Sequence, residues 1–208
     1  MTSTDTRKGD WFVTYTGQRF YPLDARVDDI DIRDIAHSLS MQCRWMGHCK
    51  TFYSIASHSL ACLRIAERTE GEAHYAKAWC LMHDAAEAYT GDIIRPLKVS
   101  LGVIEPSRGP SDQAKLHPFK GFENKLLQLI AERFGLPWPM PDMVHEIDNR
   151  MLVTEAYHLT NYERDQHWIH EKTWSSIKPY ANDRVLLHQT PAMAEEAFLK
   201  LATEYLSL

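Results

Sequence analysis

The stretch CLMHDAAEAYTGD, which runs from Cys80 to Asp92, decides how the rest of this sequence is interpreted. Its apolar residues recur at helical spacing and a glycine follows them, so the stretch predicts the end of a helix. The same helix face nevertheless carries His83, Asp84 and Glu87. Charged side chains are rarely buried unless they are paired or bound to a cation. The segment is therefore either a solvated helix face or part of a site that holds positive charge.

Helical periodicity dominates the chain on both sides of this stretch. Residues 11–21, WFVTYTGQRFY, instead place aromatic and β-branched residues around a glycine, which predicts a short hairpin or extended arm. Residues 91–118 are rich in proline and glycine and predict a long loop, and residues 163–189 are less regular. We expect an all-α bundle with a short N-terminal β arm. The expected helices cover residues 32–47, 54–69, 73–89, 119–134, 142–159 and 190–205.

Composition limits the possible partners of the protein. The 208 residues, 44% of them hydrophobic, fit one domain over residues 1–208 with a sizeable core. The formal net charge is -5 and no strongly basic stretch occurs, so duplex nucleic acid is not an expected partner. No apolar run approaches the roughly 20 residues of a membrane span, and the N-terminus has no apolar signal core. We therefore expect a cytoplasmic protein without a membrane partner. The four cysteines form no C-x-x-C pair and are expected to be free thiols.

Four polar residues interrupt the apolar faces of three different expected helices: His58, His83, Asp84 and Asp148. Taken singly, each histidine is best explained as a satisfied core residue, and each aspartate as the partner of an arginine. Taken together, two imidazoles and two carboxylates are a suitable ligand set for a divalent ion such as Mn, Co, Fe or Zn. Such an ion offsets the desolvation of buried carboxylates, and facing helices of a bundle often build such sites.

The order of these residues, H…HD…D, resembles that of the HD-domain phosphohydrolases. The segments FYSIASHS around His58, LMHDAAEAYTGDIIRPLK up to Lys98 and EIDNRMLVTEA around Asp148 are similar to the 5′-deoxynucleotidase branch and to the phage DatZ-type dATP triphosphohydrolases. The resemblance covers roughly residues 29–162 and makes residues 163–208 a C-terminal helical extension. It implies an HD-domain bundle that assembles into a homo-oligomer, in the host cytoplasm if the protein is phage-encoded.

The resemblance also implies a divalent metal ion (Co, Mn, Zn, Fe or Mg) and two catalytic carboxylates. Glu87 lies one helical turn after His83 and shares its face, so it is expected to orient or deprotonate the attacking water. The alternative for Glu87 is a capping or paired surface residue. Asp92 is expected near the scissile phosphate, with a role in proton transfer, although aspartate is equally suited to a turn at this position. The implied metal ligands are His58, His83, Asp84 and Asp148.

Three further residues are expected to bind the substrate. Lys98 and Arg44 match phosphate-contacting residues of the resembled families, and Trp45, at the end of the first helix, matches a tryptophan packed near the sugar. Ordinary core packing is the alternative for Trp45. Glu155 lies on the helix face of Asp148 and is expected to support the metal ligands.

The expected reaction converts dATP to deoxyadenosine and triphosphate. The alternatives are 5′-deoxynucleotidase action on deoxynucleoside monophosphates, a metal- and nucleotide-binding module without catalysis, and a helical interaction protein without metal. The sequence lacks the H-E-x-x-H, G-x-S-x-G and P-loop patterns of other hydrolases and nucleotide-binding enzymes.

Overall fold

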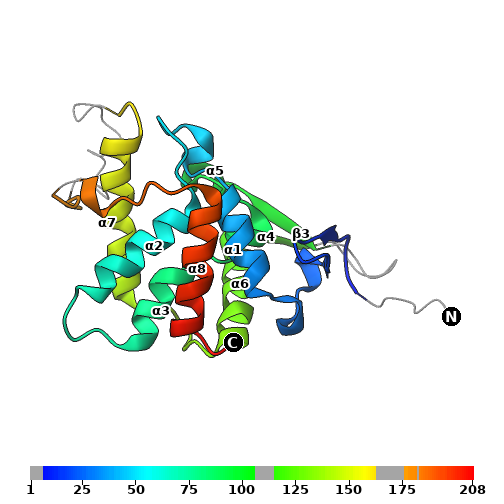
Figure 1. Ribbon diagram of the computed structural model, residues 1–208. Coiled ribbons are helices and arrows are strands. Elements are labelled where there is room, and N and C mark those ends of the chain that lie inside the picture. Colours follow the sequence, from blue (N-terminus) through cyan, green and yellow to red (C-terminus); the bar gives the residue numbers. More distant parts are fainter. Residues whose placement is uncertain (1–6, 106–114, 163–175, 182) are drawn as a thin grey trace.

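The computed structural model describes residues 7–105, 115–162, 176–181 and 183–208, and these residues form a predominantly helical bundle with two small antiparallel hairpins (Figure 1). This confirms the expected helical class and the short N-terminal β arm. No described helix combines the length and apolar character needed to span a membrane. The helices are α1 (Ile32–Met41), α2 (Ile55–Glu67), α3 (His74–Met82), α4 (Glu87–Thr90), α5 (Arg95–Lys98), α6 (Phe119–Phe134), α7 (Asp142–Leu159) and α8 (Pro191–Tyr205). The strands are β1 (Phe12–Val13), β2 (Arg19–Phe20), β3 (Gly102–Glu105) and β4 (Lys115–Pro118).

Side-chain caps set the starts of three helices. The Asp31 carboxylate accepts a hydrogen bond from the backbone of Arg33 at the start of α1, and Ser54 does the same at the start of α2. Thr190 caps α8, which has a proline in its first turn. These contacts satisfy backbone N–H groups that have no partner within the helix. The expected starts of α2 and α8, and both ends of α6 and α7, are confirmed.

Helix α2 is the centre of the bundle. It packs against α1, α3, α7 and α8, and most of its residues are buried. In Figure 1, α8 (red) lies across α2 and α3 beside α1, so the last helix of the chain closes the core. Its residues Ala194, Phe198 and Ala202 are fully buried in the main hydrophobic cluster. The C-terminal helix is therefore part of the core, whereas residues 163–175 of the expected extension lie outside the described residues.

The first expected helix was wrong at its C-terminal end. Helix α1 stops at Met41, and Cys43 then forms an isolated antiparallel bridge with Ser54. Trp45 and Met46 follow with φ angles of 58° and 50°, in the left-handed region that non-glycine residues rarely occupy. The Arg44–Trp45 pair therefore lies in a turn between α1 and α2.

The third helix was expected to be continuous, and this prediction was wrong. It divides into α3 and α4, and the turn His83–Ala86 between them is held by bonds of three-residue spacing, including the one from Glu87 N to Asp84 O (2.9 Å). Side chains three residues apart eclipse each other in such a tight turn. This places the side chains of Asp84 and Glu87 on the same side of the chain.

The expected loop over residues 91–118 was also wrong in part. It contains the short helix α5 and the hairpin β3–β4, in which Gly102 pairs with Pro118 and Ile104 pairs with Leu116. Residues 106–114, between the two strands, lie outside the described residues.

The cap of α1 gives a stability prediction. Replacing Asp31 with alanine is expected to lower the free energy of unfolding by about 1 kcal/mol, because the first turn loses its acceptor. The matched control is Asp28→Ala, since Asp28 is exposed just before the helix. Hydrogen bonding from Arg33 lowers the pKa of Asp31. The contribution is therefore present above the ordinary pKa of an aspartate and is lost as pH falls through the lowered value. Equal denaturant midpoints for both variants at neutral pH contradict the role of the cap.

Candidate metal centre

The structure brings together the four side chains that the sequence singled out as metal ligands. His58 comes from α2, His83 and Asp84 come from the turn after α3, and Asp148 comes from α7. His58 Nε2 lies 3.1 Å from His83 Nε2 and 3.2 Å from Asp148 Oδ1. His83 Nε2 lies 3.3 Å from Asp84 Oδ2 and 3.7 Å from Asp148 Oδ1. Atoms that bind one ion at about 2.1 Å lie roughly 3.0 to 3.4 Å apart, so this spacing nearly matches that of a single coordination sphere.

Hydrogen bonds on the far side of each ring orient both histidines. His83 Nδ1 lies 2.9 Å from the carbonyl oxygen of Cys80, which can only accept a hydrogen bond. His58 Nδ1 lies 2.6 Å from Glu155 Oε1. Each Nδ1 therefore donates, and each Nε2 directs its lone pair to the centre unless it carries a second proton. Two facing lone pairs at 3.1 Å require a positive charge between or beside them.

The pKa shifts in this cluster have the same physical origin. Burial alone lowers the pKa of a histidine, yet the pKa of His83 is raised well above its usual value by Asp84 and Asp148. The pKa of His58 is also raised, because Glu155 and Asp148 outweigh both burial and the nearby Arg44. Burial favours protonated carboxyls, but the two histidines hold the pKa of Asp148 well below its usual value. The cluster thus favours positive charge, and His and Asp donors at this spacing suit a divalent cation.

Cys62 is a further possible ligand, and the sequence analysis missed it. Its Sγ lies 3.6 Å from His58 Nε2, and the buried residues His58, Cys62 and His83 form a compact group of ligand atoms. Burial, together with the nearby Asp148, raises the pKa of the Cys62 thiol well above its usual value. Since a metal ligand must be the thiolate, the ionised carboxylates are the better ligands here. The sequence feature that could have identified Cys62 is its position one helical turn after His58, on the same helix face.

Arg44 lies beside the centre and contacts two carboxylates there. Its Nε donates to Glu155 Oε2 at 2.9 Å, and its Nη1 donates to Asp84 Oδ2 at 3.3 Å. The guanidinium is buried, and these carboxylates raise its pKa despite the burial. Arg44 thus connects a metal-ligand candidate to the carboxylate that orients His58. Its neighbour Trp45 is partly buried and packs against the α7 pair Val153 and Ala156.

Glu87 begins α4, and it lies close enough to Asp84 for the two carboxylates to interact. It is 6% exposed, and its Oε1 accepts a hydrogen bond from Lys98 Nζ at 3.1 Å. Its Oε2 is buried and has no hydrogen-bond partner within the described part of the chain. Burial, followed by the charges of Asp84 and Asp92, raises the pKa of Glu87 well above its usual value. A carboxylate in this state is a stronger base than an exposed one, and one of its oxygens is available.

Lys98 is held between two carboxylates, one of which the sequence did not indicate. Its Nζ donates to Glu123 Oε1 on α6 at 2.7 Å as well as to Glu87. These acids raise the pKa of Lys98 despite its burial. Glu123 has no neighbouring motif and lies far from the other site residues in sequence, so only the fold identifies it. Asp92 lies beyond α4 and is partly buried, and this burial raises the pKa of Asp92 even though Arg44 opposes the effect.

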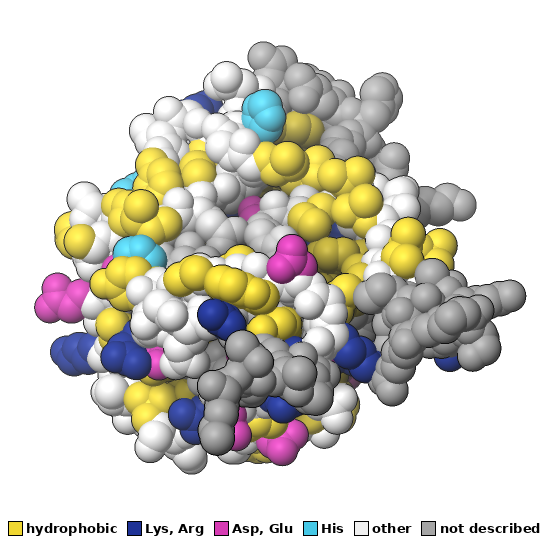
Figure 2. Space-filling model, turned by 90° about the vertical axis from the view of Figure 1, so that its right-hand side faces the viewer, with side chains coloured by type: hydrophobic (Ala, Val, Ile, Leu, Met, Phe, Trp, Pro, Cys, Tyr) yellow, Lys and Arg dark blue, Asp and Glu magenta, His cyan; other side chains and the backbone are white. Residues whose placement is uncertain are grey.

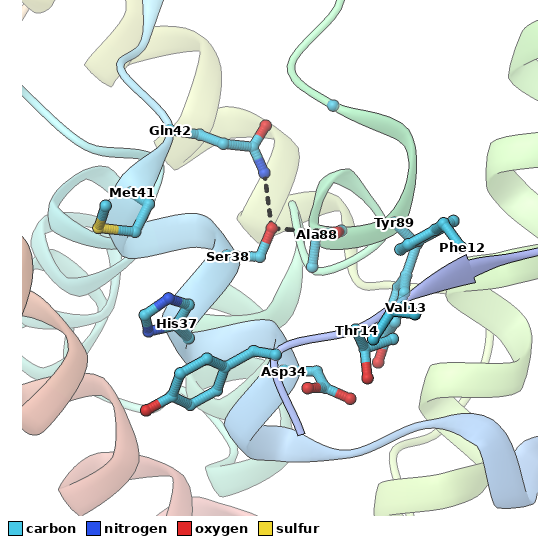
Figure 3. A pocket seen from close by; sticks show the side chains of 12 residues that line it. Phe12, Val13, Thr14, Asp34, His37, Ser38, Met41, Gln42, Ala88 and Tyr89 are labelled. Carbon is cyan, nitrogen blue, oxygen red and sulfur yellow. Dashed lines mark hydrogen bonds between the residues drawn. The ribbon is translucent and has the colours of Figure 1, made fainter. Parts of the chain in front are cut away.

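A groove of about 500 Å³ lies elsewhere, between the N-terminal hairpin and helices α1 and α4 (Figure 3). None of the predicted site residues lines it. The space-filling view in Figure 2 shows hydrophobic side chains around a hollow with a recessed acidic side chain. The groove is lined by Phe12, Val13, Thr14, Tyr15, Asp34, His37, Ser38, Met41, Gln42, Ala88, Tyr89 and Gly91.

Comparisons with known proteins give two relatives. The chain is 38% identical over 143 residues to YfdR, an uncharacterized protein of Escherichia coli strain K12, and the match covers 68% of each protein. It is 32% identical over 140 residues to an uncharacterized protein of Rhodobacter capsulatus, a match that covers 64% of this chain and 63% of that protein. No protein-family model matches the chain.

The geometry of the centre predicts metal binding that depends on Asp148. Chelator-treated protein is expected to bind one Mn²⁺ in isothermal titration calorimetry, and Mn²⁺ is expected to raise its melting temperature by mass action. Asp148→Asn should weaken binding by at least about 100-fold, more than the loss typical of an outer-shell partner. Glu146→Gln, an exposed carboxylate on the same helix, is the control and should bind normally. Equal affinities for the two variants contradict Asp148 as a ligand.

Proposed function

The chain belongs to the same family as YfdR, and we propose that it is a metal-dependent phosphohydrolase that acts on deoxynucleotides. The observation that carries the proposal is the position of Glu87, a buried carboxylate with one oxygen that has no hydrogen-bond partner within the described residues, beside the cluster of His and Asp side chains. A module that only binds nucleotide has no need of such a carboxylate. The proposed metal ligands are His58, His83, Asp84 and Asp148.

The residues of the chain divide the chemistry between them. A divalent ion in this site supplies Lewis-acid polarisation of the phosphoryl oxygen and lowers the pKa of water. Glu87 accepts a proton from the attacking water, since its raised pKa makes it a stronger base than an exposed glutamate. Lys98 and Arg44 face the same region and offset charge that develops on the phosphate oxygens.

Asp92 is suited to donate a proton to the leaving group. The water oxygen forms a bond to the α-phosphorus, and the bond from phosphorus to the 5′ oxygen of the sugar breaks. The leaving oxygen takes the bonding electron pair and needs a proton. Burial raises the pKa of Asp92, so its carboxyl retains a proton to a higher pH than an exposed aspartate does. Hydrolysis of dATP by this route gives deoxyadenosine and triphosphate.

The length of the phosphate chain separates two candidate substrates. The sequence resemblance favours dATP. The charge balance of the site favours a monophosphate, because Arg44 and Lys98 each already contact two carboxylates. Less positive charge is then left for a long phosphate tail. A 5′-deoxynucleotidase that uses the same site residues is therefore the second candidate.

A substrate panel tests the activity directly. Purified protein is incubated with deoxynucleoside and ribonucleoside mono- and triphosphates in Mn²⁺ or Co²⁺, with a chelator control, and the products are separated by chromatography. We expect metal-dependent release of deoxyadenosine and triphosphate from dATP. Turnover of monophosphates alone selects the nucleotidase activity. Failure to turn over any nucleotide with metal contradicts the proposed hydrolase.

The role of Glu87 has its own test. Glu87→Gln is expected to lower kcat by about 100-fold or more, because general acid–base catalysis typically contributes 10²- to 10⁴-fold. Nucleotide and Mn²⁺ affinities should stay near those of the wild type, since Glu87 is not a proposed ligand. Glu132→Gln, on the exposed face of α6, is the control. Undiminished kcat in the Glu87 variant overturns the assignment.

A further inference from the structure

Gln42 connects the two proposed catalytic carboxylates through its side-chain amide. It lies immediately after α1, and its Nε2 donates to the backbone carbonyl of Glu87 at 3.0 Å. Its Oε1 accepts a hydrogen bond from the backbone N–H of Asp92 at 3.1 Å. One planar amide therefore holds the first residue of α4 and the second residue beyond its end at a fixed separation.

Ser38, one turn earlier on α1, completes this contact. Gln42 Nε2 also donates to Ser38 Oγ at 3.0 Å, and Ser38 Oγ donates to the carbonyl of Ala88 at 3.0 Å. Figure 3 shows Gln42 above Ser38 and Ser38 beside Ala88, with dashed lines along this chain of hydrogen bonds. Both side chains line the groove.

Helix α4 needs such support because of its length and its sequence. It has four residues, far too few for a helix that is stable by itself. Gly91 follows with a φ of 79°, and glycine gives the backbone at this point wide conformational freedom. Without an external contact, the direction of Asp92 relative to Glu87 is weakly determined.

We propose that Gln42 is a positioning residue that fixes Glu87 and Asp92 relative to each other, an inference that rests on the proposed hydrolase function. A proton acceptor and a proton donor that act on opposite sides of one phosphorus need a fixed mutual geometry. Gln42 sets this geometry through the backbone, so neither carboxylate loses an oxygen to the contact. The metal ligands lie outside the contact and are expected to be unaffected.

The test compares Gln42→Met with Gln128→Met, a matched substitution at an exposed position on α6. Gln42→Met retains the length of the side chain and loses all three hydrogen bonds. We expect kcat to fall by about 10- to 100-fold, the loss that a small misplacement of reacting groups produces. KM and Mn²⁺ affinity should stay within about twofold of the wild type, and amide exchange at Asp92 should be faster. Gln42→Asn, one methylene shorter, is the second variant if Gln42→Met does not fold.

Each outcome decides between the two proposals. A kcat equal to that of the Gln128 control, or a parallel loss of kcat and Mn²⁺ affinity, overturns the positioning role. Absence of turnover in the wild-type protein contradicts the proposed function instead. In that case the exchange rate of the Asp92 amide still tests the contact, because an unchanged rate in both Gln42 variants overturns it.

Discussion

The buried carboxylate of Glu155 is the constraint on which the site depends. It is fully buried, and its two oxygens accept hydrogen bonds from His58 Nδ1 and Arg44 Nε. These bonds join α7 to α2 and to the turn that carries Arg44. They also orient the ring of His58, so that Nε2 faces Asp148. Arg44 and His58 keep the pKa of Glu155 low despite its burial, and loss of either partner would leave a buried charge uncompensated.

Further ion pairs surround Glu155, and acidic and basic side chains alternate along them. Arg44 reaches Asp84, which contacts His83, and Lys98 lies between Glu87 and Glu123. The carboxylates in and around the centre nevertheless outnumber the cationic side chains, which are Arg44 and Lys98. This excess of carboxylates raises the pKa of His83, and the neighbouring histidines lower the pKa of Asp148. A divalent ion would reduce this excess, which supports the proposal of a metal centre over that of a structural ion-pair network. The carboxylates are the Asp84, Asp148, Glu155, Glu87, Asp92 and Glu123 side chains.

Sequence alone predicted the parts of this arrangement that depend on helical spacing. Apolar periodicity located α6 and α7, and the polar residues that interrupt it are those that meet at the centre. Contacts between distant segments were not predictable. Glu123 has no local signal, and Gln42 is an ordinary glutamine until the fold places it against α4. The break after Met82 was missed because the hydrophobic pattern continues across it, whereas the hydrogen bonds there change from four-residue to three-residue spacing. The β3–β4 hairpin was missed because its strands are short and lie among prolines and glycines.

The most direct test of the account is the location of the metal. Diffraction data from crystals grown with Mn²⁺ would be collected on both sides of the manganese absorption edge. Peaks in the anomalous difference map would then be located relative to the site residues. The account predicts one strong peak, about 2.0 to 2.3 Å from Nε2 of His58 and His83 and from oxygens of Asp84 and Asp148. A protein without a peak there, or with an ion bound through Cys62 Sγ and away from Asp148, would contradict it.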